Sequence, residues 1–154
     1  MSARFGMFSL AFLLSTRLLT AQSVADSTAL AKSIADLVDK DARKSVDHRP
    51  PFVLTSDSNP RWSALLEAQL NAQHGQLLAP IAATGISSPA VHLSVGKVMI
   101  QGDTARVILT WSRCQPGRTG MNFWRHEITY ELVRHGTQWR ALAPLEEVDG
   151  EGRC

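Results

Sequence analysis

Residues 98–107 read Val-Met-Ile-Gln-Gly-Asp-Thr-Ala-Arg-Val and contain the strongest folding signal in the chain. Gly102 and Asp103 form a two-residue turn of the kind that joins antiparallel strands. Pairing across this turn sets two apolar pairs on one face of the sheet, Ile100 with Ala105 and Val98 with Val107. The second half of the chain is therefore expected to be an antiparallel sheet.

The residues before this hairpin alternate in the opposite phase, with Val91, Leu93 and Val95 on the apolar side. A β-bulge at residues 96–97 would bring them back into phase, opposite Leu109 and Trp111 of the next strand. This register predicts one continuous apolar face across the two strands.

A third strand is expected after a turn at residues 115–118. Its apolar face carries the even-numbered side chains Trp124, His126, Ile128, Tyr130 and Leu132. A turn at residues 135–136 then leads into a fourth strand, and pairs Leu132 with Trp139, Tyr130 with Ala141 and Ile128 with Ala143. A polar tail, residues 146–153, would follow the fourth strand.

Two helices are expected before the sheet. Residues 26–28 can cap a first helix, whose buried stripe is Leu30, Ile34, Leu37 and Val38. Asn59 can cap a second helix that has Pro60 in its first turn and ends near Gly75. Its stripe is Trp62, Leu65, Leu66 and Leu70. The loop between the helices holds at most one short strand, at residues 52–54.

These elements predict an α+β fold, in which two amphipathic helices pack on a curved, four-stranded antiparallel sheet. Residues 22–154 are short enough to form a single domain with a modest core.

Residues 1–21 have the order of a secretory signal peptide: Arg4, an apolar run over residues 5–14, and a small residue, Ala21, at the expected cleavage point. The apolar run is about half the length that a bilayer-spanning helix needs. We therefore expect a secreted or periplasmic protein, without stable membrane insertion once the signal is removed.

The charge balance limits the kinds of partner, and the cysteine content predicts a disulfide. Arg4 and Arg17 lie in the predicted signal and no acidic residue does, so residues 22–154 carry as many basic as acidic side chains. A neutral, evenly mixed surface does not favour nucleic acid as a partner. In an exported protein the only two cysteines, Cys114 and Cys154, are expected to form a disulfide, because the last strand would return the chain's end to Cys114.

No metal or cofactor is predicted. The five histidines do not lie at zinc-site spacing from one another or from a cysteine. The basic group Arg43, Lys44, His48 and Arg49 is expected to be a solvated loop, with an anion site as the alternative.

One group of residues could form a functional site. His126 and Tyr130 share a face of the third strand with Trp124, and the next strand brings Trp139 to that face. A sheet that curls around a cavity would present these side chains to a ligand, with His126 and Tyr130 as the catalytic candidates. The alternative is that the histidine, the tyrosine and the tryptophans are ordinary core residues.

Residues 128–140, which read Ile-Thr-Tyr-Glu-Leu-Val-Arg-His-Gly-Thr-Gln-Trp-Arg, resemble the last hairpin of nuclear-transport-factor-2-like domains, including the SnoaL-like branch. The resemblance covers the final third of the chain. It implies a cone-shaped sheet around a pocket, which some members use for acid–base catalysis and others only for binding. The enzymatic members place an aspartate and a histidine in the pocket, and His126 is the one clear counterpart of these residues here.

Three functions follow as expectations. The first is non-catalytic binding of a small apolar ligand or a cell-envelope partner through the concave side of the sheet, with Trp124, His126, Tyr130 and Trp139 lining the site. The second is a small acid–base enzyme of SnoaL-like type, with His126 as base and Tyr130 as orienting donor. The third is an interaction through the outer face of the first helix.

Overall fold

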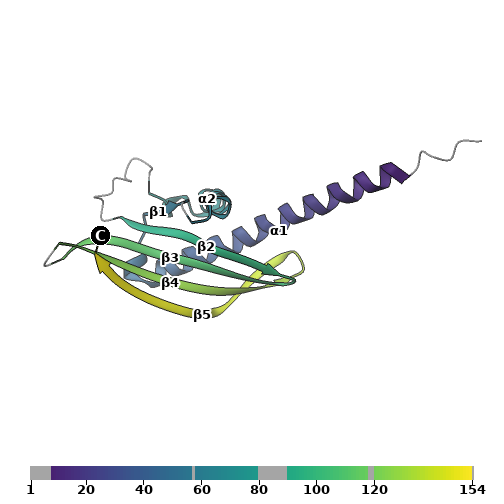
Figure 1. The fold of residues 1–154 in the computed structure, drawn as a ribbon. Coiled ribbons are helices and arrows are strands. Elements are labelled where there is room, and N and C mark those ends of the chain that lie inside the picture. The colour runs from purple at the N-terminus through teal and green to yellow at the C-terminus, as the bar shows by residue number, and fades with distance from the viewer. Residues whose placement is uncertain (1–7, 57, 80–89, 118–119, 154) are drawn as a thin grey trace, which may run out of the picture.

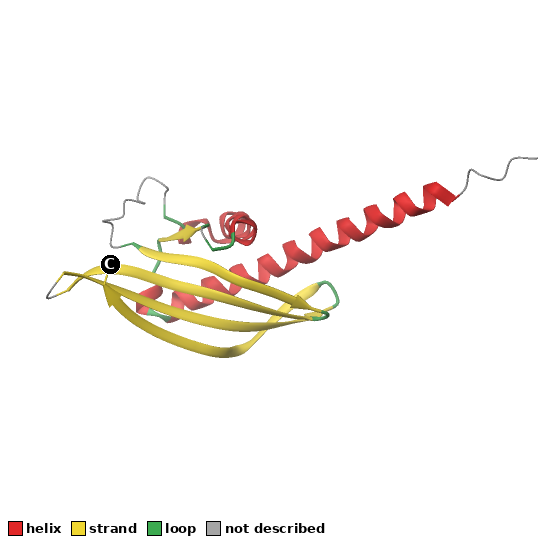
Figure 2. Ribbon diagram, in the orientation of Figure 1, coloured by secondary structure: helices red, strands yellow, loops and turns green. Residues whose placement is uncertain are grey.

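A computed structural model describes residues 8–56, 58–79, 90–117 and 120–153, with side chains from residue 24 onward. Figure 1 shows a bowed sheet with the helices packed against it, and Figure 2 marks the helices and strands in the same view. The elements are α1 (Phe8–Lys44), η1 (Val46–His48), β1 (Phe52–Thr55), α2 (Pro60–His74), η2 (Gly75–Leu77), β2 (Val91–Gln101), β3 (Thr104–Gly117), β4 (Gly120–His135) and β5 (Gln138–Arg153).

The predicted α+β class is confirmed, but the sheet has five strands in the order β1-β2-β3-β4-β5. Strands β2 to β5 form the expected antiparallel meander. The additional strand, β1, pairs with β2 in parallel. A parallel pair needs a long crossover connection, which here includes α2. The expectation of a purely antiparallel, four-stranded sheet is therefore wrong.

The register of the first hairpin is confirmed. Val98 pairs with Val107 and Ile100 with Ala105. The register shifts between Val95 and Val98, where the bulge was expected, and Leu93 lies opposite Trp111. The next turn differs, because β3 continues to Gly117 and pairs it with Gly120. The connecting residues 118–119 lie outside the described residues.

The last hairpin has a different register from the expected one. Its turn is at residues 136–137, so that Arg134 pairs with Trp139 and Leu132 with Ala141. Two irregularities follow near Tyr130, which pairs with Pro144. The expected and observed registers at Leu132 differ by two residues. Because side chains on a strand alternate with a period of two, Trp139 still lies on the buried face.

The segment expected to be a polar tail is the second half of β5. The strand pairs with β4 up to Arg153, which lies opposite Asn122. Backbone hydrogen bonding along the whole length of β4 extends the strand through residues whose side chains are almost all exposed.

The first helix begins at Phe8, earlier than the cap predicted at residues 26–28. Residues 8–25 contain no Pro or Gly, so no helix-breaking residue separates them from the helix that follows. Thr28 does not cap; its hydroxyl donates to the carbonyl of Val24, one turn earlier. The predicted signal cleavage point lies within α1, where side chains are not described, so the signal peptide stays a prediction.

The second helix starts as expected. The Asn59 side chain accepts from the backbone N–H of Trp62, Pro60 is the first helical residue, and the helix ends at His74. Asn59 also donates to the carbonyl of Gly96 in the bulge of β2. One residue therefore starts α2 and attaches it to the sheet.

The core lies between the helices and the inner face of the sheet. Leu30, Ile34 and Val38 of α1 pack with Leu66 and Leu70 of α2, as their spacing predicts. The sheet contributes Leu93, Val107, Leu109, Trp111 and Leu132. Among the described residues, no helix combines the length and the apolar composition that a membrane crossing requires.

Candidate functional site

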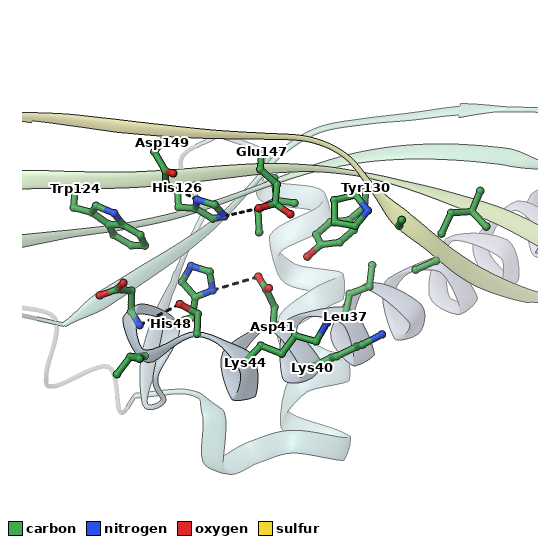
Figure 3. A pocket seen from close by; sticks show the side chains of 18 of the residues that line it. Leu37, Lys40, Asp41, Lys44, His48, Trp124, His126, Tyr130, Glu147 and Asp149 are labelled. Atoms are coloured by element: carbon green, nitrogen blue, oxygen red, sulfur yellow. Dashed lines mark hydrogen bonds and ion pairs between the residues drawn. The ribbon is translucent and has the colours of Figure 1, made fainter.

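A cavity of about 1090 Å³ opens between the C-terminal end of α1, η1 and the inner face of β4 and β5. Figure 3 shows side chains that enter it from opposite sides. Trp124, His126 and Tyr130 come from the sheet, whereas Asp41 and His48 come from α1 and η1. The bowed sheet thus leaves space where a flat sheet would pack directly on the helix.

His126 is held by carboxylates of the neighbouring strand. Its Nδ1 lies 2.6 Å from Oδ1 of Asp149, the residue opposite it in the β4–β5 pairing. Its Nε2 lies 3.8 Å from Oε2 of Glu147. A carboxylate at Nδ1 favours the tautomer that carries its proton there, and this leaves the Nε2 lone pair available as a base.

His48 faces His126 across the cavity, and the ring centroids are 5.4 Å apart. The cap at Ser45, whose hydroxyl accepts from the Asp47 backbone, sets the short turn that carries His48. The His48 ring stacks on Trp111 at 4.5 Å and 9°. Only 3% of His48 is exposed, so its orientation is determined by packing.

Asp41 connects several of these groups. Its Oδ2 accepts a 2.9 Å hydrogen bond from Nε1 of Trp111 and lies 3.4 Å from Nδ1 of His48. The His48–Asp41 contact falls short of hydrogen-bond geometry, and Nδ1 has no other partner among the described residues. Asp41 also faces the hydroxyl of Tyr130. One carboxylate thus contacts the tryptophan, the second histidine and the tyrosine.

Tyr130 is the neutral hydrogen-bonding group of the site. Burial raises the pKa of its hydroxyl above the ordinary value of 10.0. The negative charges of Asp41 and Glu147 and the side-chain hydrogen bond to Asp41 raise the pKa further. The hydroxyl therefore stays protonated across the physiological range and can donate a hydrogen bond.

Trp124 completes the wall at the end of the cavity. Its ring is parallel to that of His126, with centroids 6.1 Å apart, and Arg113 lies over the ring at 5.5 Å. Arg113 in turn donates a 2.6 Å hydrogen bond to Asp47. These stacked groups hold Trp124 and His126 in place before any ligand arrives.

The two walls of the cavity differ in charge. β5 contributes three acidic side chains, Glu147, Asp149 and Glu151, whereas α1 and η1 contribute Lys40 and Lys44 together with Asp41 and Asp47. In the part of the chain that the structure describes, no cluster of three or more His, Cys, Asp or Glu side chains is placed to hold a metal ion.

Three of the four predicted ligand-binding residues line this cavity, namely Trp124, His126 and Tyr130. Trp139 does not. It lines two other cavities, one of about 400 Å³ nearer the last turn and one of about 510 Å³ that it shares with Arg134, whose guanidinium lies over the Trp139 ring. The basic group at residues 43–49 does not act as one unit. Arg43 pairs with Asp39 and His48 is buried, whereas Lys44 lines the cavity.

Three site residues were not predicted, namely Asp41, Glu147 and Asp149, and His48 was expected only as a member of the basic group at residues 43–49. Asp41 carried a usable signal, since it follows Leu37 and Val38 by one helical turn and so extends the buried stripe. Continuing the fourth strand would have placed Glu147 and Asp149 on the same face as Ile128 and His126. The expected register would not have set Asp149 opposite His126, because that pairing depends on the irregularities near Tyr130. His48 has no such signal, because a loop has no period.

No protein-family model, curated protein or solved structure matches this chain.

Proposed function

We propose that the chain is a small acid–base enzyme that acts on a small organic substrate bound in the cavity of about 1090 Å³. The observation that carries the proposal is the carboxylate of Asp149, 2.6 Å from His126 Nδ1 at the cavity wall. A lone core histidine would need only a backbone partner, whereas a base needs the carboxylate that orients it.

In this proposal His126 Nε2 accepts a proton from the substrate. Asp149 orients the ring, and both Asp149 and Glu147 stabilise the imidazolium that forms. Tyr130 donates a hydrogen bond to a substrate oxygen, a role that its raised pKa supports. Trp124 positions the base by stacking.

The second candidate function is binding without chemistry, of a small apolar ligand or a cell-envelope partner. The observation in its favour is the aromatic content of the wall, where Trp124 and His48 line the cavity and the buried Trp111 stacks on His48. Such a wall retains an apolar ligand without any proton transfer.

Two further proposals accompany this function. The first is export to the periplasm or the exterior, supported by the order of residues 1–21. The second is membership of the nuclear-transport-factor-2-like domains, supported by the last hairpin and by a bowed sheet that holds a cavity.

The test starts from protein purified without denaturant, with its retained small molecules identified by mass spectrometry. The identified compound is then incubated with wild type, with His126→Gln, and with His74→Gln as the matched control. His74 also lies beside carboxylates, Asp36 and Asp39, but outside the cavity.

An acid–base enzyme converts the compound, and His126→Gln lowers the rate about a hundredfold or more while His74→Gln does not. Return of the compound unchanged by wild type would favour the binding function. Equal conversion by wild type and His126→Gln would exclude His126 as the base.

A further inference from the structure

Two carboxylates enter the large cavity from opposite walls and approach the same hydroxyl group. Asp41 comes from α1 and Glu147 from β5, and both point into the space beside Tyr130 (Figure 3). Burial is the largest cause of the raised pKa of Tyr130, and the negative charges of Asp41 and Glu147 are the next largest. The two acids therefore lie near enough to this hydroxyl, and to each other, for one small group to contact both.

No lysine or arginine pairs with either acid in the part of the chain that the structure describes. Lys40 and Lys44 line the same cavity, but neither forms an ion pair with a described carboxylate. The ionic contacts of the two acids are with His48 at 3.4 Å and with His126 at 3.8 Å, and an imidazole attracts a carboxylate by charge only when it is protonated. Two negative charges that face one space repel each other, and a bound cation removes that repulsion.

The buried end of this space lacks a hydrogen-bond donor. Nδ1 of His48 has no hydrogen-bond partner among the described residues, although Oδ2 of Asp41 lies 3.4 Å away and only 3% of His48 is exposed. Buried polar nitrogens are normally hydrogen-bonded. An ammonium group carries three N–H donors and no acceptor, so it can serve several acceptors at one point.

The walls around the two acids favour an organic cation over a metal ion. Leu37, Trp124, Ile128 and Leu142 line the cavity, whose volume of about 1090 Å³ far exceeds the space that a metal ion needs. Among the described residues, no three His, Cys, Asp or Glu side chains are placed to hold a metal. An apolar body attached to the cation would be buried against these side chains.

We propose that the substrate is a protonated amine with an apolar body, and that its ammonium group lies between Asp41 and Glu147. This inference rests on the proposed acid–base function and names its substrate class. The side chain of Asp41 is 15% exposed and that of Glu147 is 55% exposed, so the ammonium group bridges the interior and the mouth of the cavity. Since His126 Nε2 lies 3.8 Å from Oε2 of Glu147, the atoms next to the amine nitrogen come close to the base.

The test uses benzylamine as the probe and benzyl alcohol as an uncharged compound of nearly the same shape. Binding to the purified full chain is followed by amide NMR shifts, at constant ionic strength and at a pH where benzylamine is protonated. We expect benzylamine to bind at least about tenfold more tightly, because hydrogen bonds to a carboxylate are stronger when the donor is charged. Equal affinities, or no binding of benzylamine, would overturn the proposal.

Two substitutions locate the ammonium group. Asp41→Asn and Glu147→Gln each remove one negative charge and keep the shape of the side chain, and each should weaken benzylamine binding about tenfold. Glu146→Gln is the matched control, because Glu146 lies opposite Thr129 in the β4–β5 pairing and does not line the cavity. Glu147 is more than half exposed, so Glu147→Gln keeps the test decisive even where Asp41→Asn fails to fold.

An equal loss in Glu146→Gln and Glu147→Gln would show only a general attraction to an acidic strand, and would overturn the site. Displacement of benzylamine by Mg²⁺ or Ca²⁺ at matched ionic strength would assign the carboxylates to a metal ion and overturn the amine. Because the measurement needs no turnover, tighter binding of benzylamine supports the amine site even if the conversion test excludes His126 as the base. Loss of the amine site, in turn, leaves the outcome of that conversion test unchanged.

Discussion

Tyr130 shows how one side chain responds to its surroundings. Its ring packs in the core with Ile128 and Leu132, and its hydroxyl meets Asp41 at the cavity wall. An ionised tyrosine there would be a buried charge, and it would also lie beside two negatively charged carboxylates. Each of these effects disfavours ionisation. The protein therefore holds this hydroxyl in its neutral form.

We predict that folded protein shows no tyrosinate absorbance at the pH where unfolded protein does. Because Tyr130 is the only tyrosine in the chain, its ultraviolet absorbance can be followed without interference from another tyrosine. Above pH 10.0 the unfolded state loses this proton while the folded state keeps it, so the free energy of unfolding falls as the pH rises.

The control for this titration is the same protein in strong denaturant, where the tyrosine should ionise near its ordinary value. The prediction fails if the two titration curves coincide while circular dichroism shows that the native sample is still folded.

Among the elements, the hairpin between β2 and β3 depends on the backbone of one residue. Gly102 has φ of +60°, in the left-handed region that side chains with a Cβ disfavour. Nothing lies within 4 Å of the position that its Cβ would take, so a substitution there meets only backbone strain.

Gly102→Ala should therefore lower the free energy of unfolding by about 1 kcal/mol, as measured by urea denaturation. Gly75→Ala is the matched control. Gly75 also has open space around it, but its φ is −55°, which alanine adopts without strain. The control should be as stable as wild type or slightly more stable. Equal losses in both variants would show that the cost does not come from the backbone angle.

Side-chain hydrogen bonds hold α1 against the sheet. Arg134 of β4 donates to Asp26 of α1 at 2.9 Å and to Asp103 in the β2–β3 turn at 2.7 Å. Ser33 of α1 donates to the backbone carbonyl of Trp139 at 2.8 Å. These contacts fix α1 against the sheet at the end that carries the β2–β3 and β4–β5 turns.

At the scale of the whole molecule, the predicted disulfide requires the C-terminal end of the chain to lie near Cys114. Gly152 of β5 pairs with Phe123 of β4, and Phe123 pairs with Cys114 of β3. The end of β5 therefore lies two strands away from Cys114, at the same level of the sheet. Cys114 is not a free thiol. Cys154 lies outside the described residues, and the bond between the two cysteines stays a prediction.

We predict that thiol titration of protein purified without reductant finds no reactive thiol. Closing a loop of about 40 residues would stabilise the fold by roughly 4 kcal/mol in the chain-entropy model. Reduction, or the double change Cys114→Ser with Cys154→Ser, should lower the melting temperature. Two reactive thiols per folded chain would contradict the prediction.

The same material tests the proposed export on which this bond depends. Sequencing from the amino end should begin near Gln22, after the predicted signal has been removed. A sequence that begins at Met1 in protein recovered from the cell envelope would exclude cleavage.

Short patterns in the sequence were sufficient to predict most of the helices, strands and turns. The Gly102 turn, the bulge before Val98 and the start of α2 at Pro60 could all be predicted, because each depends on a few adjacent residues with distinctive backbone preferences. The strand face that carries Trp124, His126 and Tyr130 was also predictable, because side chains alternate along a strand.

The carboxylate beside each histidine depends on contacts between residues distant in the chain. Asp149 reaches His126 only through the full length of the β4–β5 pairing, and Asp41 reaches His48 because a helix ends against a bowed sheet. Strand pairing and helix docking are set by hydrogen bonds and packing summed over whole elements, and no short stretch of residues contains that sum. The sequence could therefore supply the histidine and the tyrosine of the site, whereas their partners emerged only when the chain was folded.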